Sequence, residues 1–230
     1  MQPLRLKHDQ QSVDALFDAG RTGTMDAGLM ALGFFATGHP GYVLIAGHAM
    51  RVPGSDAPLV GPDGPVIAEF VQAVSDPVLR GIGVEWLYNG PVFPVDRRVE
   101  VGLLILRAGL LARILDRAYR HLEPRESGGQ RILQLQLVRA CFIESFGAAD
   151  RLRMEAPQLL DPTLDLDLSA MHLDLSGVTM NASKLMGGHG YLLGETNSLE
   201  FLSLCLSSIA GFAGATRRQG LPRHLVEEAA

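Results

Sequence analysis

Cysteine is scarce in this chain of 230 residues, which contains only Cys141 and Cys205. Two cysteines cannot supply a disulfide framework or a four-ligand zinc site, and both lie in apolar segments, so we expect small, buried hydrophobic side chains. The sequence also lacks an apolar run of about 18 residues and therefore predicts no membrane-spanning helix. Residues 1–11 are polar and lack the apolar core of a secretion signal. These absences together predict a cytoplasmic protein.

An excess of basic residues is also missing. The chain has 20 Lys and Arg against 25 Asp and Glu, which gives a formal net charge of -5. A nucleic-acid-binding protein needs clustered Lys and Arg to displace phosphate counterions, so we expect no nucleic-acid partner. The histidines are spread thinly, and no pair has the helical spacing and flanking carboxylate typical of a metal site. The sequence therefore predicts no metal ligands.

The chain changes character near Val95. Before this point most of the prolines and many of the glycines are scattered among short apolar runs. Residues 41–47 contain β-branched side chains bounded by glycine, which favours a short strand that residues 48–52 could extend. Residues 53–65 contain Pro-Gly and Asp-Gly pairs, which indicate a loop. We expect residues 1–95 to form a reduced N-terminal part that contains β-structure.

After Val95 the apolar residues recur with the period of an α-helix. The pattern predicts four long helices and a short terminal one, over residues 101–118, 132–156, 164–186, 198–209 and 222–229. Residues 164–168 alternate as a strand would, but the helical stripe covers a longer window and is the stronger signal. Short connections between long helices indicate an antiparallel four-helix bundle in residues 96–230. The predicted fold class is therefore mainly α.

The stretch from Met186 to Tyr191, Met-Gly-Gly-His-Gly-Tyr, resembles the Gly-Gly-X-Gly-Tyr signature of acyl-CoA dehydrogenases, and its histidine is similar to the acyl-CoA oxidase version. Residues 109–119 resemble the first long helix of that family's C-terminal domain. Without any gap, residues 125–130 then fall at the family's Arg-X-X-Phe-Gly turn, with glycine in place of the phenylalanine. The resemblance extends over most of the chain beyond Val95 and implies the same helical domain.

The resemblance also implies a set of cofactor-binding residues. In this family the arginine of that turn and the backbone beside the double glycine contact the FAD of a neighbouring subunit. Carried over to this sequence, the half-site consists of Arg125, Gln136, Lys184, Gly187 and Gly188. A fixed guanidinium suits a pyrophosphate, glycine lets the backbone approach it, and lysine can meet a phosphate where the family has glutamine. The alternative is a solvated arginine near a simple helix stop.

The catalytic base departs from the family pattern. The family's reaction needs a carboxylate in a dry slot to remove a proton while a hydride passes to the flavin. The position that usually carries this glutamate reads Ala213, and alanine cannot accept a proton. A minority of the family places the base on the first long helix, where this chain has Val99 with Glu100 beside it. Glu100 is therefore the candidate catalytic residue, although a carboxylate in the first helical turn also balances the helix dipole.

Three functions follow from this pattern and remain open. The first is an acyl-CoA dehydrogenase-like flavoprotein component for α,β-dehydrogenation of an acyl thioester. It would complete an FAD site across a subunit interface, in a homo-oligomer or with a longer paralogue. The second is a scaffold that has lost FAD and acts on another apolar small molecule, as a cyclase or isomerase in a biosynthetic pathway. The third is a noncatalytic subunit whose exposed helix faces seek a partner.

Overall fold

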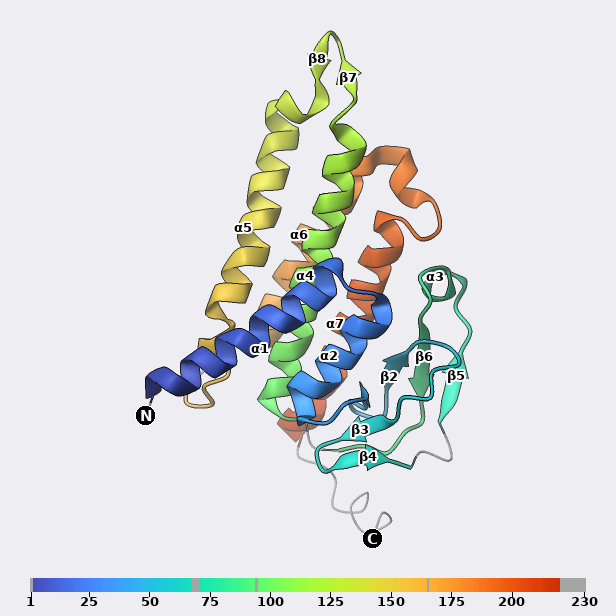
Figure 1. The fold of residues 1–230 in the computed structure, drawn as a ribbon, viewed down its shortest axis with the longest axis vertical. Coiled ribbons are helices and arrows are strands. Elements are labelled where there is room, and N and C mark those ends of the chain that lie inside the picture. The colour runs from blue at the N-terminus through green and yellow to red at the C-terminus, as the bar shows by residue number, and fades with distance from the viewer. Residues whose placement is uncertain (1, 68–70, 94, 165, 220–230) are drawn as a thin grey trace.

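The computed structural model of the protein describes residues 2–67, 71–93, 95–164 and 166–219, and within these ranges the side chains of residues 8–211 (Figure 1). The described chain is mainly α-helical, which confirms the predicted fold class. Its helices are α1 (Gln2–Thr22), α2 (Met25–Thr37), α3 (Pro77–Gly81), α4 (Arg97–Leu122), α5 (Gln136–Leu159), α6 (Leu168–Ser183) and α7 (Thr196–Gln219), with the 3-10 helices η1 (Ile132–Gln134) and η2 (Lys184–Tyr191).

The β-structure consists of short strands in small sheets. The strands are β1 (Tyr42–Val43), β2 (Ala49–Arg51), β3 (Leu59–Gly61), β4 (Gly64–Val66), β5 (Gln72–Val74), β6 (Glu85–Tyr88), β7 (Glu126–Ser127) and β8 (Gln130–Arg131). In the first sheet β3 lies between β1, to which it is parallel, and β4, to which it is antiparallel. In the second sheet β6 pairs with β2 and β5, and β7 and β8 form a hairpin.

Two predictions for the N-terminal part are wrong. Residues 41–52 do not form one strand, because a turn with a φ of 80° at Gly47 separates β1 from β2 and sends them into different sheets. Residues 53–65 are not all loop, because they contain β3 and the start of β4. The partner strand explains this difference: the N–H of Tyr42 donates to the carbonyl oxygen of Pro58 at 2.9 Å. Such pairing depends on another segment of the chain, so a local sequence rich in turn residues does not reveal it.

The four long helices predicted after Val95 are confirmed, with shifted boundaries: α5 begins at Gln136 instead of residue 132, and α7 continues to Gln219 instead of residue 209. α6 begins at Leu168 instead of residue 164, because the side chain of Asp167 accepts hydrogen bonds from the N–H groups of Ser169 and Ala170 at the helix start. The helix predicted over residues 222–229 lies outside the described residues. α4 packs against α5, α6 and α7, while the antiparallel bundle topology and the boundary between residues 95 and 96 stay predictions.

The central helix of the fold is α4. Every residue from 99 to 115 is buried, so this helix is covered on all sides. α1 and α2 cover the side that α5, α6 and α7 leave open (Figure 1). Both helices lie in the part predicted to contain β-structure, ahead of its first predicted strand. One continuous hydrophobic core therefore joins residues from α1 through α7.

Glycine permits the close crossing of α1 and α4. A Cβ atom built on Gly109 of α4 would overlap the carbonyl oxygen of Phe17 in α1. A Cβ built on Gly20 of α1 would lie 2.9 Å from the carbonyl oxygen of Leu106 in α4. The backbones themselves are therefore in contact at this crossing, and neither glycine has room for a side chain.

Replacing Gly109 with alanine is expected to lower the free energy of unfolding by about 1–3 kcal/mol, because the methyl group forces α1 and α4 apart. The matched control is Gly177→Ala in α6, where a Cβ would meet nothing within 4 Å. There alanine should stabilise the helix by about 0.5–1 kcal/mol through its lower backbone entropy. Urea unfolding followed by circular dichroism measures both variants. Equal stability of the two would contradict a tight helix crossing.

Candidate functional site

Arg125 lies just beyond the C-terminal end of α4, at the base of the β7–β8 hairpin at the top of Figure 1. Its N–H donates to the carbonyl oxygen of Leu122 and its own carbonyl oxygen accepts from the N–H of Ile132, both at 3.0 Å. These bonds hold the bend while the side chain of Arg125 stays exposed. Gln136 begins α5 and is exposed as well. Both side chains are accessible to a ligand that comes from outside the chain.

The double glycine lies in η2, directly after α6. Gly187 has a φ of 54° and a ψ of -141°, a conformation that residues with a Cβ rarely adopt. A Cβ at Gly187 or Gly188 would meet nothing within 4 Å, so the backbone of this turn is open to solvent. Lys184, at the start of η2, is exposed. The turn thus ends the helix and also leaves a backbone that another group can approach.

A pair of stacked histidines joins the two segments that carry the predicted half-site, the end of α4 and η2. The rings of His121, in the last turn of α4, and His189, in η2, lie 4.6 Å apart between centroids and are inclined by 17°. Burial lowers the pKa of His121, and the charge of Arg125 lowers it further. Arg125 and the turn with Gly188 therefore lie at the same end of the molecule. The sequence prediction did not include His121, whose position four residues before Arg125 was the available signal.

Glu100 lies at the other end of α4. It is in the first helical turn and is only 5% exposed. An α-helix rises about 1.5 Å per residue, so roughly 35 Å separates Glu100 from Arg125 along the helix axis. The predicted catalytic residue and the predicted cofactor residues can therefore meet in one site only if they come from different subunits. Ala213 lies in the last part of α7, beyond the last described side chain.

A cavity of about 240 Å³ opens beside the N-terminal end of α4. It lies between the end of α2, the first sheet and the start of α4, and its lining is mostly apolar: Ala36, Thr37, Val43, Leu44, Ile45, Gly61, Pro62, Phe93, Val95, Asp96 and Val99. Val99, the position of the alternative base, faces this cavity, whereas Glu100 is not part of its lining. The hydroxyl of Thr37 donates to the carbonyl oxygen of Gly33 at 2.9 Å. The cavity suits a small apolar group.

A polar network lies buried at the middle of α4. Arg107 is fully buried, and its Nη1 donates to Nδ1 of His172 at 2.7 Å and to the carbonyl oxygen of the same residue at 3.0 Å. Its Nη2 donates to Oγ of Ser176 at 2.6 Å and its Nε to Oγ of Ser203 at 3.0 Å. Burial lowers the pKa of Arg107 to about 10. Burial, with the charge of Arg107, lowers the pKa of His172 to about 3. One guanidinium thus connects α4 to α6 and α7.

The two cysteines differ in their surroundings. Cys205 is buried as predicted, but Cys141 is only half-buried, since α5 leaves much of its surface open. Among the described side chains, no three His, Cys, Asp or Glu residues gather closely enough to hold a metal ion. No helix in the described part of the chain is both long and apolar enough to cross a membrane.

The fold matches that of solved structures. No family model and no curated protein matches the chain. A variant of the Tcur3481-Tcur3483 steroid ACAD, an acyl-CoA dehydrogenase, superimposes with a TM-score of 0.52 at 15% identity, over 94% of this chain and 75% of that chain. This chain has the fold of an acyl-CoA dehydrogenase. The resemblance carried by the double glycine and the arginine turn is therefore confirmed at the level of the fold.

Two further structures match in part. An electron-transferring flavoprotein of Acidaminococcus fermentans matches with a TM-score of 0.49 at 14% identity, over 85% of this chain and 64% of that chain. The ChsE4-ChsE5 complex from Mycobacterium tuberculosis matches with a TM-score of 0.45 at 18% identity, over 81% of this chain and 60% of that chain. This chain thus spans less than two thirds of the length of either of these two chains.

Proposed function

We propose that this protein is an acyl-CoA dehydrogenase-like flavoprotein component that takes part in the α,β-dehydrogenation of an acyl thioester. In this proposal it completes an FAD site across a subunit interface. The observation that carries the proposal is the exposed end of α4, where Arg125 and the open turn at Gly187 and Gly188 lie together. The fold shared with a steroid acyl-CoA dehydrogenase supports it.

Each half-site residue has a role that suits its chemistry. Arg125 offers a planar guanidinium, and Lys184 a mobile ammonium, for the two phosphates of the cofactor. Gly187 and Gly188 let a phosphate approach the backbone N–H groups closely, and the amide of Gln136 can donate or accept a hydrogen bond. Bound FAD would supply the hydride acceptor of the reaction. The side chains of this chain hold it and fix its orientation.

The acyl group is assigned to the apolar cavity beside Val99. A lining of this kind excludes water and accommodates a hydrocarbon segment. Neither base that the family pattern suggests serves this cavity, because Glu100 is buried outside its lining and Ala213 cannot take a proton. We therefore assign the base to a partner subunit. Glu100 can take this role only in a site that forms between chains.

Exposed apolar side chains support an oligomer. They are concentrated on α5, α6 and the segment around η2, and include Leu137, Ile143, Leu173, Tyr191 and Leu193, with exposed fractions of 85%, 68%, 73%, 71% and 65%. Side chains of this size gather on a surface where another protein covers them, since apolar area is stabilised by removal from water. The partner is a second copy of this chain or a longer paralogue that carries a complete flavin-binding domain.

The test is purification of the chain together with a full-length acyl-CoA dehydrogenase paralogue from the same organism. The complex is expected to be yellow, and its flavin absorption should bleach when acyl-CoA is added without oxygen. Arg125→Ala should weaken FAD binding by about tenfold, the effect of about 1.4 kcal/mol, because a charge-assisted contact is lost. Arg151→Ala, an exposed arginine on α5, is the matched control. A colourless complex that does not respond to acyl-CoA would refute the proposal.

One observation favours a second function. The cavity near Val99 is lined mostly by apolar side chains of this chain alone, so an apolar substrate could bind there without flavin. In that case the protein is a flavin-independent scaffold, such as a cyclase or isomerase of a biosynthetic pathway. A colourless protein whose cavity binds a fluorescent apolar probe, and loses it in Val99→Trp, would support this alternative. If the protein is instead a noncatalytic subunit, we expect a stable complex in which neither FAD nor the probe binds.

A further inference from the structure

The stacked histidines contain an unused hydrogen-bonding atom. Nε2 of His121 is shielded from solvent and has no hydrogen-bond partner among the described residues. His189 lies against it, ring on ring, and is itself exposed. A buried polar atom without a partner is unfavourable, and each such atom in a native structure calls for a ligand, water or ion. His121 thus has one ring nitrogen without a partner, beside an exposed histidine.

The charges around this pair are mainly positive. Burial lowers the pKa of His121, Arg125 and His189 lower it further, and Glu195 raises it. Glu195 is already engaged, because one of its carboxylate oxygens lies 3.6 Å from Nη1 of Arg117. The same Nη1 donates to the carbonyl oxygen of Gly194 at 2.6 Å. The local field therefore favours an anion, which would relieve the repulsion among the basic groups.

We infer that His121 and His189 form a proton-linked binding site for a phosphate group. The inference rests on the proposed FAD half-site and adds two residues to it. A protonated imidazole donates from both ring nitrogens, so Nε2 of His121 would gain an acceptor and the exposed ring of His189 a second contact. The open backbone at Gly187 lets the phosphate approach the pair. Because two adjacent imidazolium ions repel each other, the anion and the protons bind together.

The same chemistry is present in two biological ligands, the pyrophosphate of FAD and the pyrophosphate of coenzyme A. Inorganic pyrophosphate is therefore the first probe, and FAD and coenzyme A are compared with it. A larger affinity for FAD assigns the site to the flavin, and a larger affinity for coenzyme A assigns it to the thioester substrate. Both outcomes support a phosphate site. If none of the three ligands binds at a concentration of about 10 mM, which would mostly occupy a site with a Kd of about 1 mM, the inference is overturned.

The experiment measures binding and protonation in the full chain. Calorimetry with pyrophosphate is expected to give about tenfold tighter binding at about pH 5.5 than at about pH 7.5. Histidine NMR titration should show a higher pKa for His121 when pyrophosphate is present. His189→Asn, at an exposed position that folding tolerates, should weaken binding and remove most of its pH dependence. His121→Asn should do the same if the variant retains the native circular dichroism spectrum.

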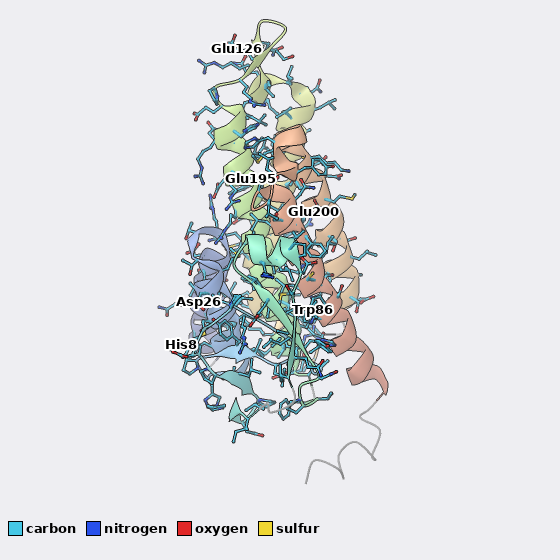
Figure 2. All side chains as sticks on the ribbon, turned by 90° about the vertical axis from the view of Figure 1, so that its right-hand side faces the viewer. His8, Asp26, Trp86, Glu126, Glu195 and Glu200 are labelled. Atoms are coloured by element: carbon cyan, nitrogen blue, oxygen red, sulfur yellow. The ribbon has the colours of Figure 1, made fainter. Side chains whose placement is uncertain are left out.

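The matched control is His8→Asn. His8 is exposed on α1 and lies toward the lower end of the molecule in Figure 2, whereas Glu126 and Glu195 lie toward the upper end. This variant should bind pyrophosphate as the unchanged protein does. Binding that is independent of pH, or equal in His189→Asn, would overturn the inference. A colourless paralogue complex with intact proton-linked binding would reject the proposed function alone, and a yellow complex with pH-independent binding would reject the inference alone.

Discussion

Replacing Arg107 with alanine is expected to lower the free energy of unfolding by about 3–5 kcal/mol, more than the loss expected for Gly109→Ala. The change removes four hydrogen bonds, which leaves the buried carbonyl oxygen and Nδ1 of His172 without this donor. It also opens a cavity between α4, α6 and α7. Acceptors left without a donor and a newly formed cavity both destabilise a buried site. Urea unfolding followed by circular dichroism measures the change.

Two further variants separate the causes. Arg107→Met fills most of the volume but makes none of the hydrogen bonds, so it should be about 2 kcal/mol more stable than Arg107→Ala. Because burial lowers the pKa of Arg107 to about 10, keeping its charge in the core has a cost, which both variants remove equally. Arg151→Ala on the exposed surface of α5 should change stability by less than about 0.5 kcal/mol. An Arg107→Ala variant as stable as Arg151→Ala would mean that the network does not hold the helices.

The network also explains why α4 could be predicted only in part. The helical period after Val95 predicts its existence, because apolar residues recur at the right spacing. The pattern predicts a one-sided stripe, whereas residues 99–115 are buried on every side. Arg107 interrupts an apolar sequence and therefore reads as a solvent-facing residue. Its burial depends on acceptors from α6 and α7, which no local pattern reveals.

The N-terminal helices were harder to predict for a related reason. α1 is largely polar, and among its described side chains few are buried, such as Val13, Leu16 and Phe17. Its contact with α4 depends on Gly20 and Gly109, and glycine in a helix is a signal against the helix when read locally. Tertiary packing overrides that local cost. Helices with an apolar stripe can therefore be predicted from the sequence, whereas α1, which relies on close backbone contact, leaves no such signal.

The candidate site, too, could be predicted from the sequence only in part. Arg125, Gly187 and Gly188 were predicted from a resemblance, and the structure places them exposed at one end of α4, while the half-site itself stays a prediction. The stack of His121 on His189 and the cavity near Val99 were not predicted. Both arise where segments distant in sequence meet, and a single histidine or valine in the sequence does not indicate such a meeting. Glu100 stays a predicted base, although its separation from Arg125 requires a second subunit.

Acidification is expected to destabilise the protein through His172. Burial and the adjacent charge of Arg107 lower its pKa to about 3 in the folded chain, whereas the backbone of Glu100 raises it. Ser176 and Ser203 complete its polar surroundings through Arg107. In the unfolded chain the pKa returns to about 6.5. A folded pKa below the unfolded value means that stability is fully present above about pH 6.5 and falls as the pH is lowered, by up to about 1.4 kcal/mol per pH unit, until about pH 3.

The measurement compares the pH dependence of unfolding in His172→Gln and in the unchanged protein. Glutamine does not titrate, and its carbonyl oxygen can accept the hydrogen bond from Arg107. Between about pH 6 and about pH 4 the free energy of unfolding should fall more steeply in the unchanged protein than in His172→Gln. The difference in slope should correspond to close to one additional proton taken up on unfolding. His8→Gln, at an exposed position, should leave the slope as it is. Equal slopes for His172→Gln and the unchanged protein would mean that His172 already accepts a proton in the folded core, which the 2.7 Å contact with the guanidinium of Arg107 opposes.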